Sequence, residues 1–280
     1  MLAMPMLGRK SPPPYVVPGG LLSAIPAGWV GLRLCVPGYT GAAINVRRSS
    51  DNTAMDIGCV GGNLDVATLL NFSGSGSAYV TRGYNQGTLG SAGDLTQGTA
   101  AYQQRIVNAG VLETQNGLPA MNFGWTTGPC FFNTPAALCP SGTQSSAINI
   151  VATYETDSST TGLFNDGRGS IPVFSSSVRI DGGGAAGPSG MAMPIGAAQI
   201  VTGLWTSTSV ALYQDGSNTA SKTFSAYSVT QSGGRIGQGG STGYWPGKIQ
   251  EFVAWLVAPP TADQHGVEHN QEAYYGISGV

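Results

Sequence analysis

The sequence predicts an all-β sandwich of two antiparallel sheets, and three observations indicate it. Of the 280 residues, 43 are glycine and 17 are proline, which favours many short strands joined by tight turns. The hydrophobic content of 41% is too high for a disordered chain of that composition. Short segments of alternating polarity, separated by turn residues, recur along the chain at the spacing of a sandwich.

The N-terminal residues 1–28 are expected to form an extended arm that is rich in proline and methionine. Proline lacks a donor N–H and favours extended conformations, so the arm suits docking onto a partner. We expect apolar side chains to anchor it there, namely Leu7, Tyr15, Val17, Leu22 and Ile25. The sandwich is expected to occupy residues 29–280 as one unit.

The strands of the sandwich are predicted by alternation of apolar and polar residues. In chain order they are expected over residues 43–48, 78–82, 120–123, 147–155, 162–165 and 171–180. A hairpin follows, with strands over 199–204, 209–214 and 222–227, and it turns at Asp215-Gly216, because both residue types tolerate positive φ. A final strand over 247–256 is expected to join the hairpin in one antiparallel framework.

Two short helices are expected outside the sheets. The first spans residues 65–72, where Asp65 is a suitable capping residue. The second spans residues 261–275 after a pair of prolines, with Thr261 as its N-cap.

Charge and composition exclude several function classes. A formal net charge of −2 with 12 basic residues argues against nucleic-acid binding, and no apolar run is long enough for a membrane span. Basic residues follow the first apolar stretch rather than precede it, so we expect no secretion signal. Cys130 and Cys139 flank a proline-rich loop and would bridge in an oxidising compartment; the alternative is that all four cysteines are free buried thiols.

A charged segment in this weakly charged chain carries a family resemblance. Residues 40–52 end in Val46-Arg47-Arg48-Ser49-Ser50-Asp51-Asn52, and Met55-Asp56-Ile57-Gly58 follows; further short runs occur at residues 62–65, 84–86, 94–97 and 116–120. This set resembles the start of the catalytic domain of fungal B-type α-L-arabinofuranosidases, a concanavalin-like jelly roll. From about residue 147 the chain is similar, more loosely, to laminin-G-like domains. The resemblance implies a jelly-roll fold.

The resemblance also implies where catalytic acids would lie, and the sequence departs from it there. The family's nucleophilic glutamate matches residues 171–174 and its acid aspartate matches residues 237–241, yet neither segment holds an acid, and the vicinal cysteine pair is missing. A retaining glycosidase needs two carboxyl groups about 5–5.5 Å apart. Glu155 and Asp157 lie two apart on an expected strand end, but we interpret them as solvated charges. We therefore predict no catalytic residue.

Two other motifs are interpreted as structural. His265-Gly266-Val267-Glu268-His269 has the spacing of a zinc motif, but a third ligand has little chain left to come from. The glycine-rich residues 182–187 precede a proline and cannot start a phosphate-binding helix. We expect neither a metal nor a cofactor.

Two sets of residues are candidates for a binding or supporting role. One set is interpreted as a structural network that fixes an irregular loop, namely Arg47, Arg48, Asp51 and Asp56. The alternative is that these residues form a sugar-binding cleft. Strand alternation places Arg47 and Arg48 on opposite faces. Aromatic residues at expected turns are the candidates for stacking on a glycan, namely Tyr84, Trp125, Tyr244 and Trp245.

These observations lead to a functional hypothesis. A carbohydrate-type fold without its acids, an anchoring arm and no secretion signal predict a non-catalytic virion protein of a tailed bacteriophage, a capsid decoration or tail component on the particle surface. Expected partners are other virion proteins, a second copy of the chain and a cell-surface glycan, with neither nucleic acid nor membrane. The alternatives are an arabinofuranosidase-like glycoside hydrolase whose acids have moved to Glu155, Asp157 or Glu251, and a soluble lectin.

Overall fold

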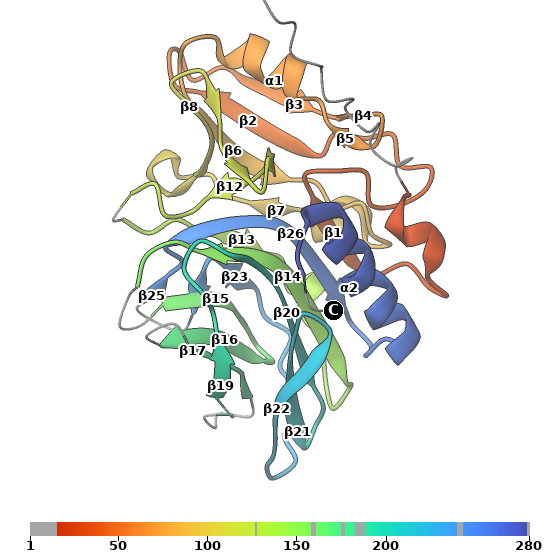
Figure 1. Ribbon diagram of the computed structural model, residues 1–280. Helices are drawn as coiled ribbons and strands as arrows, with labels where there is room; N and C mark the ends of the chain where they lie inside the picture. Colours follow the sequence, from red (N-terminus) through yellow and green to blue (C-terminus); the bar gives the residue numbers. More distant parts are fainter. Residues whose placement is uncertain are drawn as a thin grey trace, which may run out of the picture.

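The computed structural model describes residues 16–126, 128–157, 161–174, 177–182, 187, 189–239 and 243–278. Strands dominate it, and two α-helices lie at its periphery (Figure 1). All strand pairs are antiparallel, and they form two packed layers. The predicted all-β sandwich is confirmed.

The first layer contains the strands that carry the site described below. Its order is β3 (Ala54–Ile57), β2 (Ile44–Arg48), β6 (Ala78–Gly83), β7 (Leu95–Thr96), β13 (Phe132–Thr134), β23 (Gly234–Ile236), β15 (Thr161–Asp166), β16 (Gly169–Phe174), β17 (Ser177–Arg179) and β19 (Ser189–Ala192). The short β18 (Asp181–Gly182) also pairs with β16.

The second layer has the longest strands at its centre. Its order is β9 (Val111–Leu112), β8 (Gln104–Asn108), β12 (Met121–Asn122), β26 (Gly247–Trp255), β14 (Ser146–Tyr154), β20 (Ala198–Trp205), β21 (Ser209–Gln214) and β22 (Ser217–Thr223), with β1 (Gly28–Gly31) beside β12 on β26. Pairing of β6 with β8 joins the two layers. Short two-stranded pairs complete the fold: β4 (Cys59–Val60) with β5 (Asn63–Leu64), β10 (Thr114–Gln115) with β11 (Leu118–Pro119), and β24 (Gln238–Gly239) with β25 (Gly243–Tyr244).

The core lies between the two layers, because alternate residues of each strand point inward. Phe164 of β15 stacks on Phe252 of β26 with ring centroids 6.2 Å apart. Phe123 meets Phe132 of β13 edge-on at 6.0 Å. These contacts join opposite layers, so the inward faces form one apolar core.

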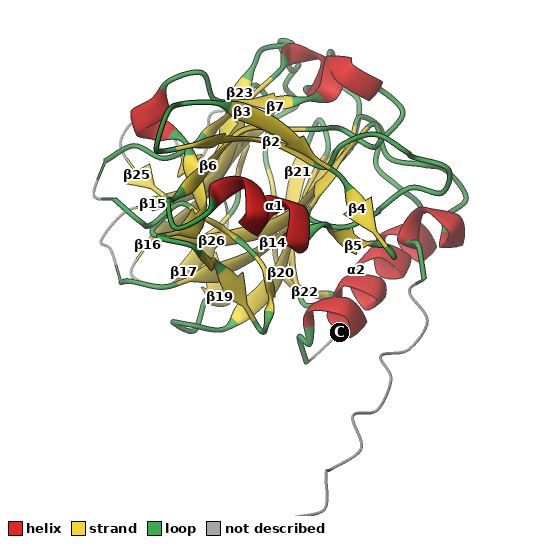
Figure 2. Ribbon diagram, turned by 90° about the horizontal axis from the view of Figure 1, so that it is seen from above, coloured by secondary structure: helices red, strands yellow, loops and turns green. Residues whose placement is uncertain are grey.

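The outer face of the second layer is covered by helix α2 (Thr261–Tyr275) through a buried polar layer (Figures 1 and 2). Glu251 of β26 accepts hydrogen bonds from Arg33 and from Gln271 of the helix, and Arg33 and Glu251 are both 0% exposed. Gln271 also donates to Asn149 of β14. Polar side chains therefore fix the position of α2. Among the described residues, neither helix is long and apolar enough to cross a membrane.

Local sequence signals predicted several elements correctly. Helix α1 (Val66–Ser73) is capped by Asp65, whose carboxylate accepts from the Thr68 N–H. The hairpin turns at Asp215-Gly216 with φ of 45° and 80°. β22 begins directly after this turn rather than at residue 222, because a two-residue turn leaves no spacer before the next strand. The expected strand over 171–180 is divided between β16 and β17.

Two further details differ from the sequence-based prediction or lie outside it. The N-cap of α2 is Pro260, and Thr261 is the first helical residue. Leu7 and Tyr15 of the expected arm lie outside the described residues. Residues 16–28 include the 3-10 helix η1 (Pro18–Leu21), and they lie against α2, where Ser23 donates to Asp263. Attachment of the arm to a partner stays a prediction.

Candidate functional site

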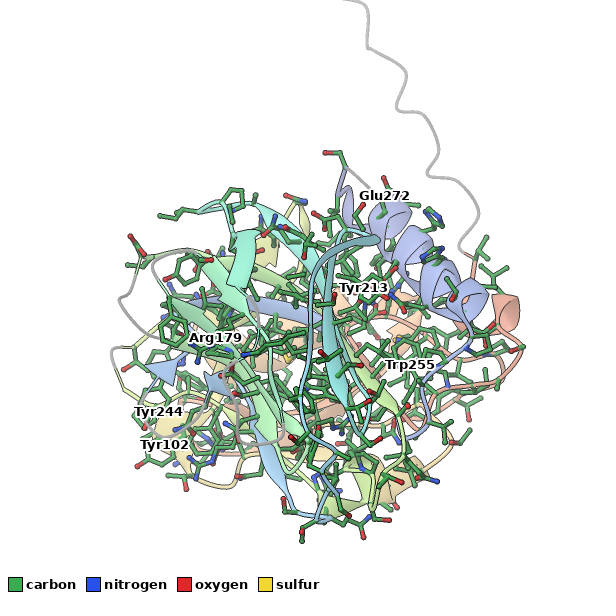
Figure 3. The ribbon with its side chains drawn as sticks, turned by 90° about the horizontal axis from the view of Figure 1, so that it is seen from below. Tyr102, Arg179, Tyr213, Tyr244, Trp255 and Glu272 are labelled. Atoms are coloured by element: carbon green, nitrogen blue, oxygen red, sulfur yellow. The ribbon has the colours of Figure 1, made fainter. Side chains whose placement is uncertain are left out.

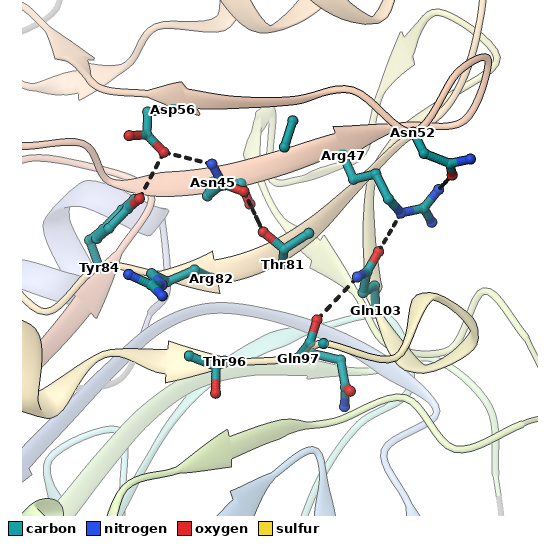
Figure 4. Close-up of a pocket in the computed structure, with 12 residues that line it drawn as sticks. Asn45, Arg47, Asn52, Asp56, Thr81, Arg82, Tyr84, Thr96, Gln97 and Gln103 are labelled. Atoms are coloured by element: carbon teal, nitrogen blue, oxygen red, sulfur yellow. Dashed lines mark hydrogen bonds between the residues drawn. The ribbon is translucent and has the colours of Figure 1, made fainter.

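A polar pocket of about 580 Å³ lies on the outer face of the first layer, over β2, β3, β6 and β7 (Figure 4). Its lining is rich in amide, hydroxyl and charged side chains, with Asn45, Arg47, Asp56, Arg82, Tyr84 and Gln103 among them. Such groups both donate and accept hydrogen bonds, as the hydroxyl groups of a sugar do.

Strand alternation places these side chains on one face. On β2, Ile44 and Val46 are buried in the core, whereas Asn45 and Arg47 face the pocket. Asn45 stands opposite Asp56 of β3 in the register. Directly paired residues of antiparallel strands point to the same face. The alternation of β2 therefore produces both the core and the pocket.

Asp56 is the exposed carboxylate of this pocket. One of its oxygens, Oδ1, accepts a hydrogen bond of 2.7 Å from Asn45 Nδ2 and another of 2.7 Å from the Tyr84 hydroxyl. Burial, helped by the hydrogen bond to Asp56, raises the pKa of Tyr84 to about 12. Tyr84 therefore stays neutral at physiological pH and donates its proton to the carboxylate.

Arg47 is held at the other end of the pocket by neutral partners. Its Nε donates to Gln103 Oε1 at 2.9 Å and its Nη1 to Asn52 Oδ1 at 2.7 Å. The guanidinium also lies over the ring of Tyr79, 5.1 Å from its centroid. These contacts fix the side chain but leave its charge without a carboxylate among the described residues.

A second, smaller pocket of about 300 Å³ adjoins the first, since Arg82 and Thr96 line both. Its carboxylate is Asp94, whose Oδ2 lies 3.6 Å from Arg82 Nη1 and whose Oδ1 accepts from the backbone N–H of Asn85. Arg82 thus stands between the two pockets, and each pocket holds one aspartate.

The four residues of the predicted charged network divide between two places. Arg48 pairs with Asp51 at 2.6 Å and lies over the Phe72 ring, away from the pocket. Arg47 and Asp56 line the pocket. Adjacent residues of one strand thus point to opposite faces, as alternation requires.

Of the four aromatic residues proposed for glycan stacking, only Tyr84 lines a described pocket. Trp125 lines neither described pocket and donates to the backbone oxygen of Gln103. Tyr244 lies at the edge of the molecule, on the side away from α2 (Figure 3). Trp245 is 1% exposed and packs on Tyr154, so its ring has no face free for a sugar.

The carboxylates considered from the sequence lie elsewhere. Glu251 is fully buried and paired with Arg33, which makes it part of the layer beneath α2. Glu155 pairs with Lys248 at 2.8 Å. Asp157 is exposed and lies within 3.5 Å of the Tyr154 hydroxyl. None of the three lines either described pocket.

The two segments that match catalytic positions of the resembled family lie close together in the fold. Pro172 of β16 pairs with Gly162 of β15, and a Cβ on Gly162 would lie 1.8 Å from the Cα of Gly239 on β24. Residues 240 and 241 lie outside the described residues. Ile171 and Val173 are buried in the core, so this part of β16 contributes packing.

The histidine motif does not assemble a metal site. His265 and His269 lie on α2 with ring centroids 6.2 Å apart, but Glu268 points inward and accepts hydrogen bonds from Thr202 and Gln264. Within the described stretches no three metal-ligating side chains converge. All four cysteines lie in those stretches and carry free thiols.

Several pocket residues were not singled out from the sequence, notably Asn45, Arg82 and Gln103. Asn45 and Arg82 occupy polar positions of alternating strands, which indicate an exposed face but not a site. Gln103 lies just before β8 and is only 2% exposed, so it gave no such signal. The short sequence runs that carry the family resemblance instead contain buried side-chain amides, and these fix the conformation of loops. Asn85 accepts from the Trp29 N–H, and Gln86 bonds both the N–H of Cys35 and the carbonyl of Arg33.

Comparisons with known proteins place the fold. No family model matches the chain, and no curated protein matches its sequence. Among solved structures, it is similar to a GH54 α-L-arabinofuranosidase mutant soaked with 4-nitrophenyl α-L-arabinofuranoside, with TM-score 0.72, 15% identity and 92% of this chain covered. An arabinofuranosidase in complex with arabinofuranosyl-α-1,2-xylobiose matches with TM-score 0.72 and 16% identity. The chain spans 65% of the length of each of these structures.

The arabinofuranosidase-like jelly roll expected from the sequence is thereby confirmed as a fold. The prediction of a non-catalytic virion protein is wrong: the structures that share this fold over 92% of the chain are arabinofuranosidases, which are enzymes. That prediction rested on the absence of acids at two matched segments, whereas the structure shows Asp56 and Asp94 lining pockets on the same layer.

Proposed function

We propose that this chain is a glycoside hydrolase of the arabinofuranosidase-like type that binds its saccharide in the two adjoining pockets. One observation carries the proposal: each pocket on this face of the jelly roll holds one aspartate, and Arg82 stands between them. A glycosidase needs two carboxyl groups, one as acid and one as nucleophile or base. Asp56 and Asp94 are the residues proposed for these roles.

The surroundings of the two aspartates support different roles. Asp56 is exposed and uses one oxygen for Asn45 and Tyr84, so its second oxygen faces solvent space where a substrate would lie. The Asp94 side chain is 7% exposed, and its Oδ2 lies 3.6 Å from Arg82 Nη1, which places this carboxylate beside a positive charge. We assign proton transfer to Asp56 and charge stabilisation or nucleophilic attack to Asp94.

The test is release of nitrophenol from 4-nitrophenyl α-L-arabinofuranoside by the full chain. Asp56→Asn and Asp94→Asn are expected to lower kcat by about 100-fold or more, the usual effect of removing an acid–base group. Asp51→Asn is the matched control, because Asp51 is a neighbouring exposed aspartate outside both pockets.

Two outcomes would contradict the proposal. Saccharide binding without turnover on any arabinofuranoside would refute the hydrolase and favour a lectin. Turnover that survives both pocket variants but is lost in Glu155→Gln or Asp157→Asn would move the acids to the end of β14.

A further inference from the structure

A single row of polar side chains crosses the outer face of the first layer. The strand register joins its members pair by pair, each opposite the next: Asp56, Asn45, Arg82, Thr96, Asn133, Arg235 and Asn165. They come from seven neighbouring strands, β3, β2, β6, β7, β13, β23 and β15. All seven are partly or fully exposed.

The opposite face of the same strands is apolar, so the polar row lies on the outer face of the layer along its whole length. Phe132, Ile236, Phe164 and Ile171 are paired in the neighbouring register positions and are buried in the core. With strands about 4.8 Å apart, the six steps of the row extend about 29 Å. A ligand that follows it must be long and must lie across the strands. Both pockets lie on its first five members.

The arginines of this face give it a charge that the rest of the chain lacks. The formal net charge of this face is +1, from the three arginines Arg47, Arg82 and Arg235 and the two aspartates Asp56 and Asp94 (three minus two). The whole chain has a formal net charge of −2. Arg47 hydrogen-bonds only amide oxygens, and its Nη2 has no partner among the described residues. Arg235 likewise donates to the amide oxygen of Gln238 and lies 4.3 Å from the ring centroid of Phe131.

We propose that this row, together with Arg47 beside Asn45 on the same face of β2, binds a linear acidic oligosaccharide, one with uronic acid carboxylates, laid across the strands from Asp56 to Arg235. The inference rests on the proposed carbohydrate function and adds the class of substrate. A planar guanidinium with free N–H groups matches a carboxylate with two parallel hydrogen bonds. Thr96 and Asn133, between Arg82 and Arg235, and Asn45, between Asp56 and Arg82, suit the hydroxyl groups of the sugar rings.

The test compares two probes on the unmodified full chain by isothermal titration calorimetry: tetragalacturonate and its fully methyl-esterified form, which has the same backbone without charge. The acid is expected to bind at least about tenfold more tightly, and the difference is expected to shrink as ionic strength rises. Arg47→Gln and Arg235→Gln are expected to weaken binding of the acid by about tenfold each, and binding of the uncharged ester by a clearly smaller factor. Arg48→Gln, the neighbour on the opposite face of β2, is the matched control.

Equal affinity for acid and ester would overturn this inference. The hydrolase proposal would then stand or fall separately on turnover of the arabinofuranoside. Binding of an oligothymidylate as tight as that of tetragalacturonate would also overturn it, because charge alone would then explain the affinity. If Arg48→Gln weakened binding of the acid as much as Arg47→Gln does, this face would not be the binding site.

Discussion

Removing the buried carboxylate of Glu251 tests how α2 is held on the sandwich. Glu251 accepts five hydrogen bonds: two from Arg33 at 2.6 and 3.2 Å, and one each from Trp29 at 3.0 Å, Gln271 at 3.0 Å and Tyr275 at 2.8 Å. Glu251→Ala leaves the Arg33 guanidinium buried without its counter-charge. Breaking such a pair from one side costs about 3–5 kcal/mol.

The free energy of unfolding, measured by urea denaturation, is expected to fall by that amount. For a chain of this size the melting temperature should drop by about 10 °C. Asp51→Ala is the control, because the pair of Asp51 with Arg48 is 44% and 33% exposed, and such pairs contribute about 0–1 kcal/mol. A cost for Glu251→Ala below 1 kcal/mol, similar to that of the control, would refute the argument that this network fixes the helix.

The same carboxylate gives a pH dependence with a defined sign. Burial acts to raise the pKa of Glu251, but the Arg33 charge and the hydrogen bonds from Arg33, Gln271 and Tyr275 hold it below its ordinary value. A lowered pKa in the folded state means that the group stabilises the protein above its unfolded pKa. Stability is lost as the pH falls through the folded value.

Three further predictions concern stability. Burial raises the pKa of Glu268, so wild type should lose stability as the pH rises above about 4.3, the ordinary pKa of a glutamate. Glu268→Gln should remove that decline. Identical pH profiles of the melting temperatures of wild type and variant would contradict this prediction. Gly162→Ala should cost about 3 kcal/mol in urea denaturation, because the new Cβ meets Gly239 at 1.8 Å; an unchanged midpoint would show that β15 and β24 are not in contact. Asp65→Ala should cost about 1 kcal/mol, since it removes the cap on the Thr68 N–H, and Asp65→Asn should recover most of it.

The sequence by itself determined the local structure and the fold class. The Asp215-Gly216 turn and the Asp65 cap could be predicted because each depends on backbone torsions and hydrogen bonds within a few residues. The alternation of β2 gave its buried and exposed faces for the same reason. The short runs that carry the family resemblance predicted the jelly roll correctly. They include Asn85 and Gln86, whose side-chain amides fix loops on which the fold depends.

Only the tertiary structure decided which exposed residues form a site. Asp56 and Arg235 lie 179 positions apart in the chain (235 minus 56), and a row through both exists only because six strands pair in one register. Arg33 and Glu251, separated by 218 positions, meet for the same kind of reason. Register depends on how both layers pack against one core, and shifting a strand by one residue would turn its polar side chains to the other face. No local pattern contains that information.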